Sequence, residues 1–174
     1  YGDMVVADRS GGLAKVFARQ DDCIDANFNG QIETSTNNVA LPYGQDECLA
    51  WRIDIPRMPN TYDDRRGPRA VQWTLPEGIG NCDFTGADVW VAFCNENDND
   101  ATEWLVDGES GDVEVEIPIV GMMCEMMGPY GGGLDIHNNF WFVENDTRKA
   151  LYMAKYDCMP GPGEDCWEVY DRPD

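Results

Sequence analysis

Hydrophobic residues along this chain alternate with polar ones over short stretches, and no stretch shows the spacing of a convincing helix. Residues 50–55 alternate as a half-covered strand does, whereas residues 88–93 are nearly all apolar, as in a strand covered on both faces. Eighteen glycines and ten prolines supply turns between such stretches. Short strands at this spacing predict an all-β fold with antiparallel sheets. The predicted strands are residues 3–8, 13–17, 50–55, 71–73, 88–93, 103–107, 113–117, 133–136, 139–143, 150–156 and 167–170.

Three segments share one pattern, in which a polar turn precedes an apolar strand, a polar excursion and a second strand. They are residues 2–16, 86–107 and 137–157. Self-similarity of this kind is typical of repeat architectures, and it predicts the blades of a β-propeller, each a small antiparallel sheet. We therefore interpret residues 1–174 as a single propeller segment that carries one insertion, at about residues 21–49.

That insertion contains the strongest chemical signal, because residues 25–33 read D-x-N-x-N-G-x-I-x. Asp25, Asn27 and Asn29 place oxygen-bearing side chains at alternate positions, and Gly30 permits the sharp turn that follows. Calcium takes six to eight oxygen ligands, and loops of this type supply them from nearby positions. The segment predicts a calcium site. The alternative is a metal-free turn, since Asn, Asp and Gly dominate turns for their own reasons.

The remaining ligands of the predicted site are less regular. Gln31 would contribute its backbone carbonyl, and Glu33 occupies a position that often binds through water. An EF-hand needs a bidentate acid at the twelfth loop position, where this chain has Thr36. We therefore expect the missing carboxylate to come from Asp46 or Glu47, so that the loop resembles an EF-hand without being one.

Seven cysteines in this length point to disulfides. The chain has no C-x-x-C motif and one histidine, so zinc lacks its usual ligand sets, and an oxidising compartment is the better interpretation. Spacing alone cannot establish the connectivity. The pairs that are close in sequence are Cys23 with Cys48, Cys82 with Cys94 and Cys158 with Cys166, which leaves Cys124 over.

The net charge limits the kinds of partner that the chain can bind. Thirty-three acidic residues against twelve basic ones give a net charge of −21, which repels nucleic acid and anionic membrane surfaces. No apolar run is long enough to span a membrane. We expect a secreted, periplasmic or cell-surface protein that binds calcium. Because the chain opens with Tyr1 in what reads as the middle of a strand, we also expect it to be a piece of a longer protein.

A resemblance to a known family adds to this picture. Residues 128–135 (GPYGGGLD) and 139–145 (NFWFVEN) are similar to the blade repeat of the streptogramin lyase (virginiamycin B lyase-like) β-propellers, which reads roughly P-x-G-x-x-x-D-x-x-G-N-x-W-F-T-E. Residues 68–73 are a weaker copy of its opening. The calcium-loop segment with its bracketing cysteines resembles an insertion in large secreted bacterial propeller proteins of unassigned function.

The resemblance implies a seven-bladed propeller, of which this chain would hold about three to four blades at roughly 40–50 residues per repeat. Lyases of the family use histidine and glutamate around magnesium, and the candidates here are His137 and Glu144, with no second histidine. One hypothesis is a calcium-stabilised structural or binding module, with protein partners or the remainder of the same propeller around it. The alternative is a lyase-like enzyme with a divalent metal in the central channel. A third use, copper binding by the methionine-rich residues 122–127, competes with simple core filling.

Overall fold

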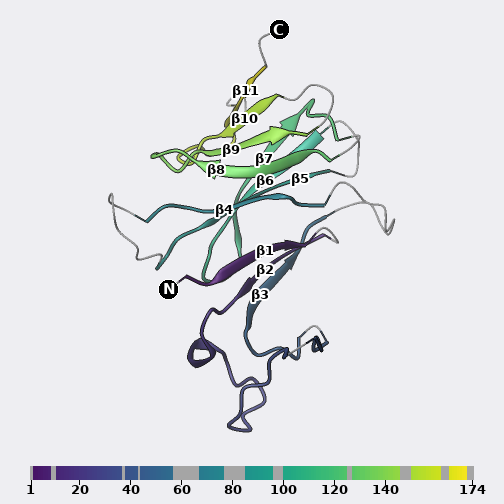
Figure 1. Ribbon diagram of the computed structural model, residues 1–174. Helices are drawn as coiled ribbons and strands as arrows, with labels where there is room; N and C mark the ends of the chain where they lie inside the picture. Colours follow the sequence, from purple (N-terminus) through teal and green to yellow (C-terminus); the bar gives the residue numbers. More distant parts are fainter. Residues whose placement is uncertain are drawn as a thin grey trace.

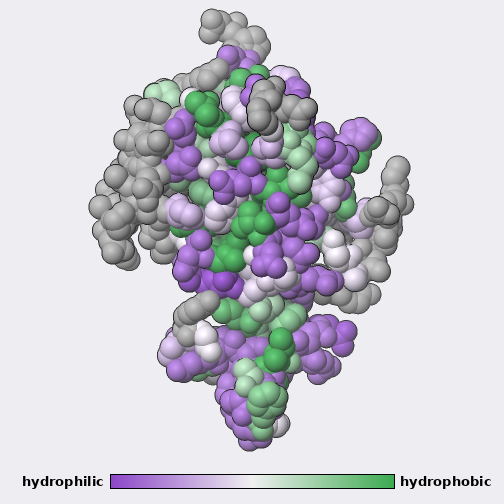
Figure 2. All heavy atoms as spheres, turned by 180° about the vertical axis from the view of Figure 1, so that it is seen from behind, coloured by the Kyte–Doolittle hydropathy of each residue, from purple (hydrophilic) through white to green (hydrophobic). Residues whose placement is uncertain are grey.

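The computed structural model describes residues 2–8, 11–36, 38–42, 44–56, 67–76, 85–95, 100–124, 127–145, 150–161 and 165–171. In these ranges the chain forms three antiparallel sheets, one above another, and one short 3₁₀ helix, η1 (Gln20–Asp22) (Figure 1). No helix in the described ranges has the length and apolar character needed to cross a membrane. Seen from behind, the surface is mainly hydrophilic, in keeping with the net charge of −21, with smaller hydrophobic patches between (Figure 2).

Each sheet is a meander in which strands consecutive in sequence pair with one another. Sheet I has the order β1-β2-β3, sheet II the order β4-β5-β6-β7, and sheet III the order β11-β10-β9-β8. Sheet I consists of β1 (Met4–Asp8), β2 (Gly12–Val16) and β3 (Leu49–Asp54). Sheet II consists of β4 (Ala70–Trp73), β5 (Val89–Cys94), β6 (Asp100–Val106) and β7 (Val113–Val120). Sheet III consists of β8 (Pro129–Leu134), β9 (Phe140–Glu144), β10 (Leu151–Ala154) and β11 (Trp167–Tyr170).

The all-β antiparallel prediction is confirmed, and each predicted strand overlaps a strand of the structure. The largest shift is in β8, which starts at Pro129 rather than at residue 133. The glycine-rich stretch looked like a turn, but it pairs with β9 across a register shift between Tyr130 and Gly133. Glycine belongs there because a Cβ on Gly132 would lie 2.9 Å from the Phe140 ring.

The core lies on both sides of sheet II. In β5, Val89, Val91 and Phe93 pack toward sheet I, whereas Trp90 and Ala92 belong to the cluster shared with sheet III. This two-sided packing explains why the strand is apolar at successive positions and entirely buried. Burying one such side chain contributes about 1.5–3 kcal/mol to the free energy of folding, so packing on sheet II stabilises both other sheets.

The first strands of the three sheets lie side by side, but sheet I is reversed relative to the other two. The start of β1 lies near the end of β4, whereas the ends of β4 and β8 lie together, where the Leu75 N–H donates to Asn138 Oδ1. β4, the first strand of sheet II, lies beside β1, the first strand of sheet I, and also beside β8, the first strand of sheet III. The first strands therefore form one row along the stack, and the later strands of each sheet extend away from that row.

One predicted disulfide is wrong. Cys94 is bonded to Cys124 rather than to Cys82, which lies outside the described residues. The reason lies in the pairing of the strands. β6 begins at Asp100, next to the end of β5, and Asp100 pairs with Val120 at the end of β7. The residues after β7 thereby reach the end of β5. Local spacing in the sequence could not show this contact.

The other two disulfides follow the prediction, since Cys23 is bonded to Cys48 and Cys158 to Cys166. Cys124 is consequently not the unpaired cysteine, and its thiolate is not free for the copper site considered above. Three disulfides within one chain are consistent with an oxidising compartment.

Gly128 packs against the Cys94–Cys124 disulfide, and its replacement by alanine is expected to be costly. It has φ 58°, and a Cβ there would lie 2.0 Å from the Cys94 Sγ atom. Gly131 is a matched control, because it has φ 72° and no atom within 4 Å of an added Cβ. We expect Gly131→Ala to cost about 1 kcal/mol of unfolding free energy through backbone strain, and Gly128→Ala about 2–3 kcal/mol. Urea unfolding of both variants measures the difference, and equal losses would contradict the packing argument.

Candidate metal centre

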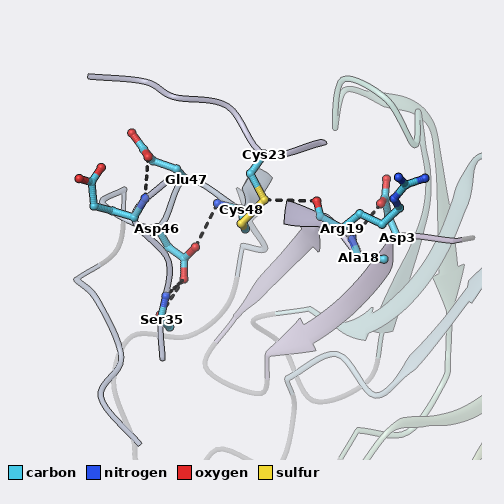
Figure 3. Close-up of a disulfide and its surroundings, with 9 residues drawn as sticks. Asp3, Ala18, Arg19, Cys23, Ser35, Asp46, Glu47 and Cys48 are labelled. Atoms are coloured by element: carbon cyan, nitrogen blue, oxygen red, sulfur yellow. Dashed lines mark hydrogen bonds between the residues drawn. A yellow bond between two sulfur atoms is a disulfide. The ribbon is translucent and has the colours of Figure 1, made fainter. Parts of the chain in front are cut away.

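The predicted calcium segment lies in the long connection between β2 and β3, which extends from sheet I away from the other two sheets (Figure 1). The Cys23–Cys48 disulfide joins the two sides of its base, with Cα atoms 4.5 Å apart (Figure 3). Two backbone hydrogen bonds continue this closure. The Ile24 N–H donates to the Glu47 carbonyl at 3.0 Å, and the Glu47 N–H donates to the Glu33 carbonyl at 2.8 Å. The connection is therefore a closed loop with a fixed base.

Asp25 organises the tight turn at the start of the loop. Its carboxylate accepts hydrogen bonds from the Asn29 N–H at 3.1 Å and the Gly30 N–H at 2.8 Å. The chain turns around this carboxylate through positive φ angles at Phe28 (59°) and Gly30 (80°). A bulky residue with positive φ is unusual, and Phe28 is 90% exposed, so its own side-chain packing does not impose that conformation. The hydrogen bonds around Asp25 are what hold the turn.

Glu33 lies against both predicted amide ligands. The side-chain amides of Asn27 and Asn29 donate to its two carboxylate oxygens, each at 2.8 Å. The hydrogen bonds from Asn29 and Asn27 lower the pKa of Glu33, although the charge of Asp25 opposes them. Gln31 belongs to the same turn, since its N–H donates to Asn29 Oδ1 at 2.8 Å. The structure thus brings Asp25, Asn27, Asn29, Gln31 and Glu33 together.

The two candidates for the missing carboxylate take different positions. Glu47 is buried beneath the turn and accepts the N–H groups of Ala26 at 2.9 Å and Glu33 at 2.8 Å. Asp46 instead accepts both the N–H and the hydroxyl of Ser35, at 3.0 and 2.7 Å (Figure 3). Burial raises the pKa of Asp46, but the Ser35 hydrogen bonds outweigh it and lower the pKa overall. Glu47 is therefore the acid next to the predicted ligands, whereas Asp46 is hydrogen-bonded to Ser35 on the other side of the loop.

A hollow of ≈ 440 Å³ opens beside this group of oxygens. Its lining includes Asn27, Glu33 and Glu47. None of the ion pairs among the described residues involves Asp25, Glu33 or Glu47, so three carboxylates share one small region without a basic partner there. Carboxylate and amide oxygens in this number are the donors that calcium prefers.

A second acidic group, which sequence reasoning missed, lies at one end of sheet II. Carboxylate oxygens of Asp88, Asp107 and Glu114 lie within 4.8 Å of one another. Burial raises the pKa of Asp88, although the Tyr156 hydroxyl, which donates to Asp88 Oδ2 at 2.8 Å, opposes this shift. Burial and the charges of the other two acids raise the pKa of Glu114. The pairing of β5 with β6 could have predicted part of this group. Val89 at the start of β5 lies opposite Val106 at the end of β6, which brings the adjacent Asp88 and Asp107 together.

The lyase candidates His137 and Glu144 are not brought together. His137 is exposed in the turn before β9, where its N–H donates to Asp135 Oδ1 at 2.8 Å. Glu144 is buried at the far end of the same strand and accepts a hydrogen bond from the Tyr152 hydroxyl at 3.1 Å. Because β9 lies between them and rises about 3.3 Å per residue, they occupy opposite ends of sheet III.

Comparison of the chain with models of known protein families, with curated proteins and with solved structures gives no match. The relationship to streptogramin lyase propellers stays a resemblance between short motifs, and the function has to be argued from the geometry.

Proposed function

We propose that this chain is a calcium-stabilised section of a β-propeller that acts as a structural or binding module in a secreted, periplasmic or cell-surface protein. The loop between β2 and β3 carries the proposal. In it Asp25, Asn27, Asn29 and Glu33 converge on one turn, with Glu47 beneath them.

Electrostatics supports calcium as the ion. The carboxylates of Asp25, Glu33 and Glu47 repel one another, and a divalent cation would offset that repulsion. Asn27 and Asn29 would add neutral oxygens, and Gln31 its backbone carbonyl, toward the six to eight ligands that calcium takes. The positive φ at Phe28 supports a built site rather than an ordinary turn, because strained backbone persists where the surroundings require it.

The stacking of the sheets supports the propeller. Propeller blades are small antiparallel meanders, each packed face to face on the next around a common axis. Sheets I, II and III are such meanders, they pack face to face, and their first strands lie in one row. β4 and β8 also run in the same direction, as the inner strands of neighbouring blades do, whereas β1 runs the opposite way. The disulfides and the acidic surface support a place outside the cytoplasm.

Calcium should raise the melting temperature. In about hundredfold excess over its dissociation constant, the ion stabilises the folded state by about 2.7 kcal/mol, which is roughly 5–10 °C for a chain of this size. We expect Asp25→Ala to abolish the shift, because it removes both the ligand and the hub of the turn. Circular dichroism melts with calcium and with chelator measure it.

The matched control is Asp22→Ala, which removes one exposed acid just outside the ligand set and should keep the full shift. If chelator leaves the wild-type melting curve unmoved, the segment is a metal-free turn and the calcium proposal is wrong.

A further inference from the structure

We propose that the turn around Asp25 modifies itself covalently, by closing the side chain of Asn29 onto the backbone nitrogen of Gly30 with loss of ammonia. The product is a cyclic imide, which water opens to aspartate or isoaspartate. Residues 29 and 30 are the one Asn-Gly pair in the sequence. The inference goes beyond the calcium proposal and does not rest on it, because the reaction uses only groups of the chain and water.

The side chain of Asn29 is folded over the peptide bond that follows it. Its Oδ1 atom accepts a hydrogen bond from the Gln31 N–H at 2.8 Å, so the side-chain amide lies against the peptide that joins Asn29 to Gly30. The same hydrogen bond polarises the side-chain carbonyl and stabilises the negative charge that develops on Oδ1 during attack. Holding the reacting groups together in this way removes much of the entropic cost of forming the bond.

The Gly30 nitrogen is the nucleophile, and a carboxylate is placed to take its proton. The Gly30 N–H donates to Asp25 Oδ2 at 2.8 Å, which is within the reach that a general base needs. An N–H bond lies in the plane of its peptide, so this contact leaves the face of the peptide to the Asn29 side chain. Among the described residues, no atom beyond the chain neighbours lies within 4 Å of the place that a Cβ on Gly30 would take, so nothing crowds the approach.

The reaction balances within the turn and the surrounding water. A bond forms between the Gly30 nitrogen and Asn29 Cγ, and the bond between Cγ and Nδ2 breaks. The Gly30 proton passes through the Asp25 carboxylate to Nδ2, which leaves as ammonia. Asn29 Nδ2 donates to Glu33 Oε1 at 2.8 Å, so a second carboxylate holds the leaving group. Water then opens the ring at the side-chain carbonyl, which gives aspartate, or at the backbone carbonyl, which gives isoaspartate.

The modification changes the charge of the loop. Residue 29 gains a carboxylate and loses the amide that donates to Glu33. Four carboxylates then share the region in which the unmodified chain has those of Asp25, Glu33 and Glu47. Like charges at such short range repel one another, so the modified turn is looser in the absence of a cation.

The test follows residue 29 in the full chain, with chelator present so that calcium plays no part. Mass spectrometry of a digest measures the fraction of this residue that has gained about one dalton. The folded chain is compared, at the same pH and temperature, with the chain reduced and unfolded in guanidinium chloride. Because the base and the polarising N–H are in place only in the folded turn, the folded chain should react about a hundredfold faster. An unfolded chain that reacts as fast as the folded one overturns the proposal.

Asp25→Asn tests the base, since it removes the carboxylate and keeps an oxygen that can accept the Gly30 N–H. The variant should react about a hundredfold more slowly than the wild type, whether it keeps the turn or opens it, because an open turn also lacks the base. Asp22→Asn makes the same change at an exposed residue outside the turn and should react as the wild type does. An Asp25→Asn variant that reacts at the wild-type rate would show that the turn does not catalyse the closure.

Discussion

Replacing both Cys94 and Cys124 with alanine is expected to lower the free energy of unfolding by about 3–4 kcal/mol. Thirty residues separate the two cysteines, and the bond restricts the unfolded chain over that whole length. Both side chains are also buried in the cluster between sheets II and III, which includes Met122. The variant loses this packing as well as the covalent link.

The Cys158–Cys166 bond is the matched control, because its separation is 8 residues. Its removal is expected to cost about 2–3 kcal/mol on the same entropic argument. Chemical unfolding of the two double variants beside the wild type, without reductant, measures both losses. A smaller loss for the Cys94–Cys124 variant than for the control would show that the longer link adds nothing to the stability of sheet II.

Replacing Glu103 should stabilise the protein, and by more as the pH rises. Glu103 lies in the middle of β6 with no exposed surface, and neither of its carboxylate oxygens has a hydrogen-bond partner in the described part of the chain. Burial raises its pKa well above the ordinary value of 4.5. Its neighbours across the sheet are Ala92 and Ile117, which offer no hydrogen bond from their side chains.

The sign of the pH dependence follows from the raised pKa. The folded state holds the proton more tightly than the unfolded state, so the contribution of Glu103 is most favourable below pH 4.5. It is lost progressively as the pH rises from there through the folded-state pKa. Each unit of pKa difference corresponds to about 1.4 kcal/mol.

Two substitutions separate the effects at this site. Glu103→Gln removes the titration but keeps a buried polar group, whereas Glu103→Met also removes the polarity. An unsatisfied buried polar group costs about 1–3 kcal/mol even when it is neutral. We therefore expect Met to stabilise at every pH, and Gln to do so increasingly from acid to neutral pH.

Melting temperatures of wild type and variants from pH 4 to pH 8 measure this, because the difference between them isolates Glu103 from the other acids. Glu109→Gln, in the exposed turn between β6 and β7, is the control and should leave the melting temperature unchanged. A Glu103→Gln variant that is no more stable than wild type at neutral pH would show that the carboxylate is accommodated after all.

Much of the fold followed from local pattern, and the reason is physical. Strand alternation and glycine turns are properties of adjacent residues, so the hairpin of β6 and β7 and the inner position of β5 could be predicted. The same holds for the turn around Asp25, whose hydrogen-bonded groups lie within a few residues of one another.

What local pattern missed depends on contacts between segments far apart in the chain. Cys124 reaches Cys94 only because two strands return it there, and no spacing rule contains that path. Glu103 reads as a polar residue on an alternating strand, yet a whole sheet covers it. The different roles of Asp46 and Glu47, adjacent in sequence, were likewise decided by which side of the loop each one faces.

The loop between β2 and β3 is attached to sheet I through a narrow base. The Phe17 N–H donates to the Cys48 carbonyl at 2.9 Å, and the disulfide lies just beyond, so the loop leaves and re-enters the sheet at one place. Such an element is portable. The hydrogen bonds and the disulfide that close it lie within residues 17–48, so its closure does not involve sheets II and III. The same base suits the loop for grafting onto another antiparallel hairpin, where a melting shift on addition of calcium would test the proposed site apart from the sheets.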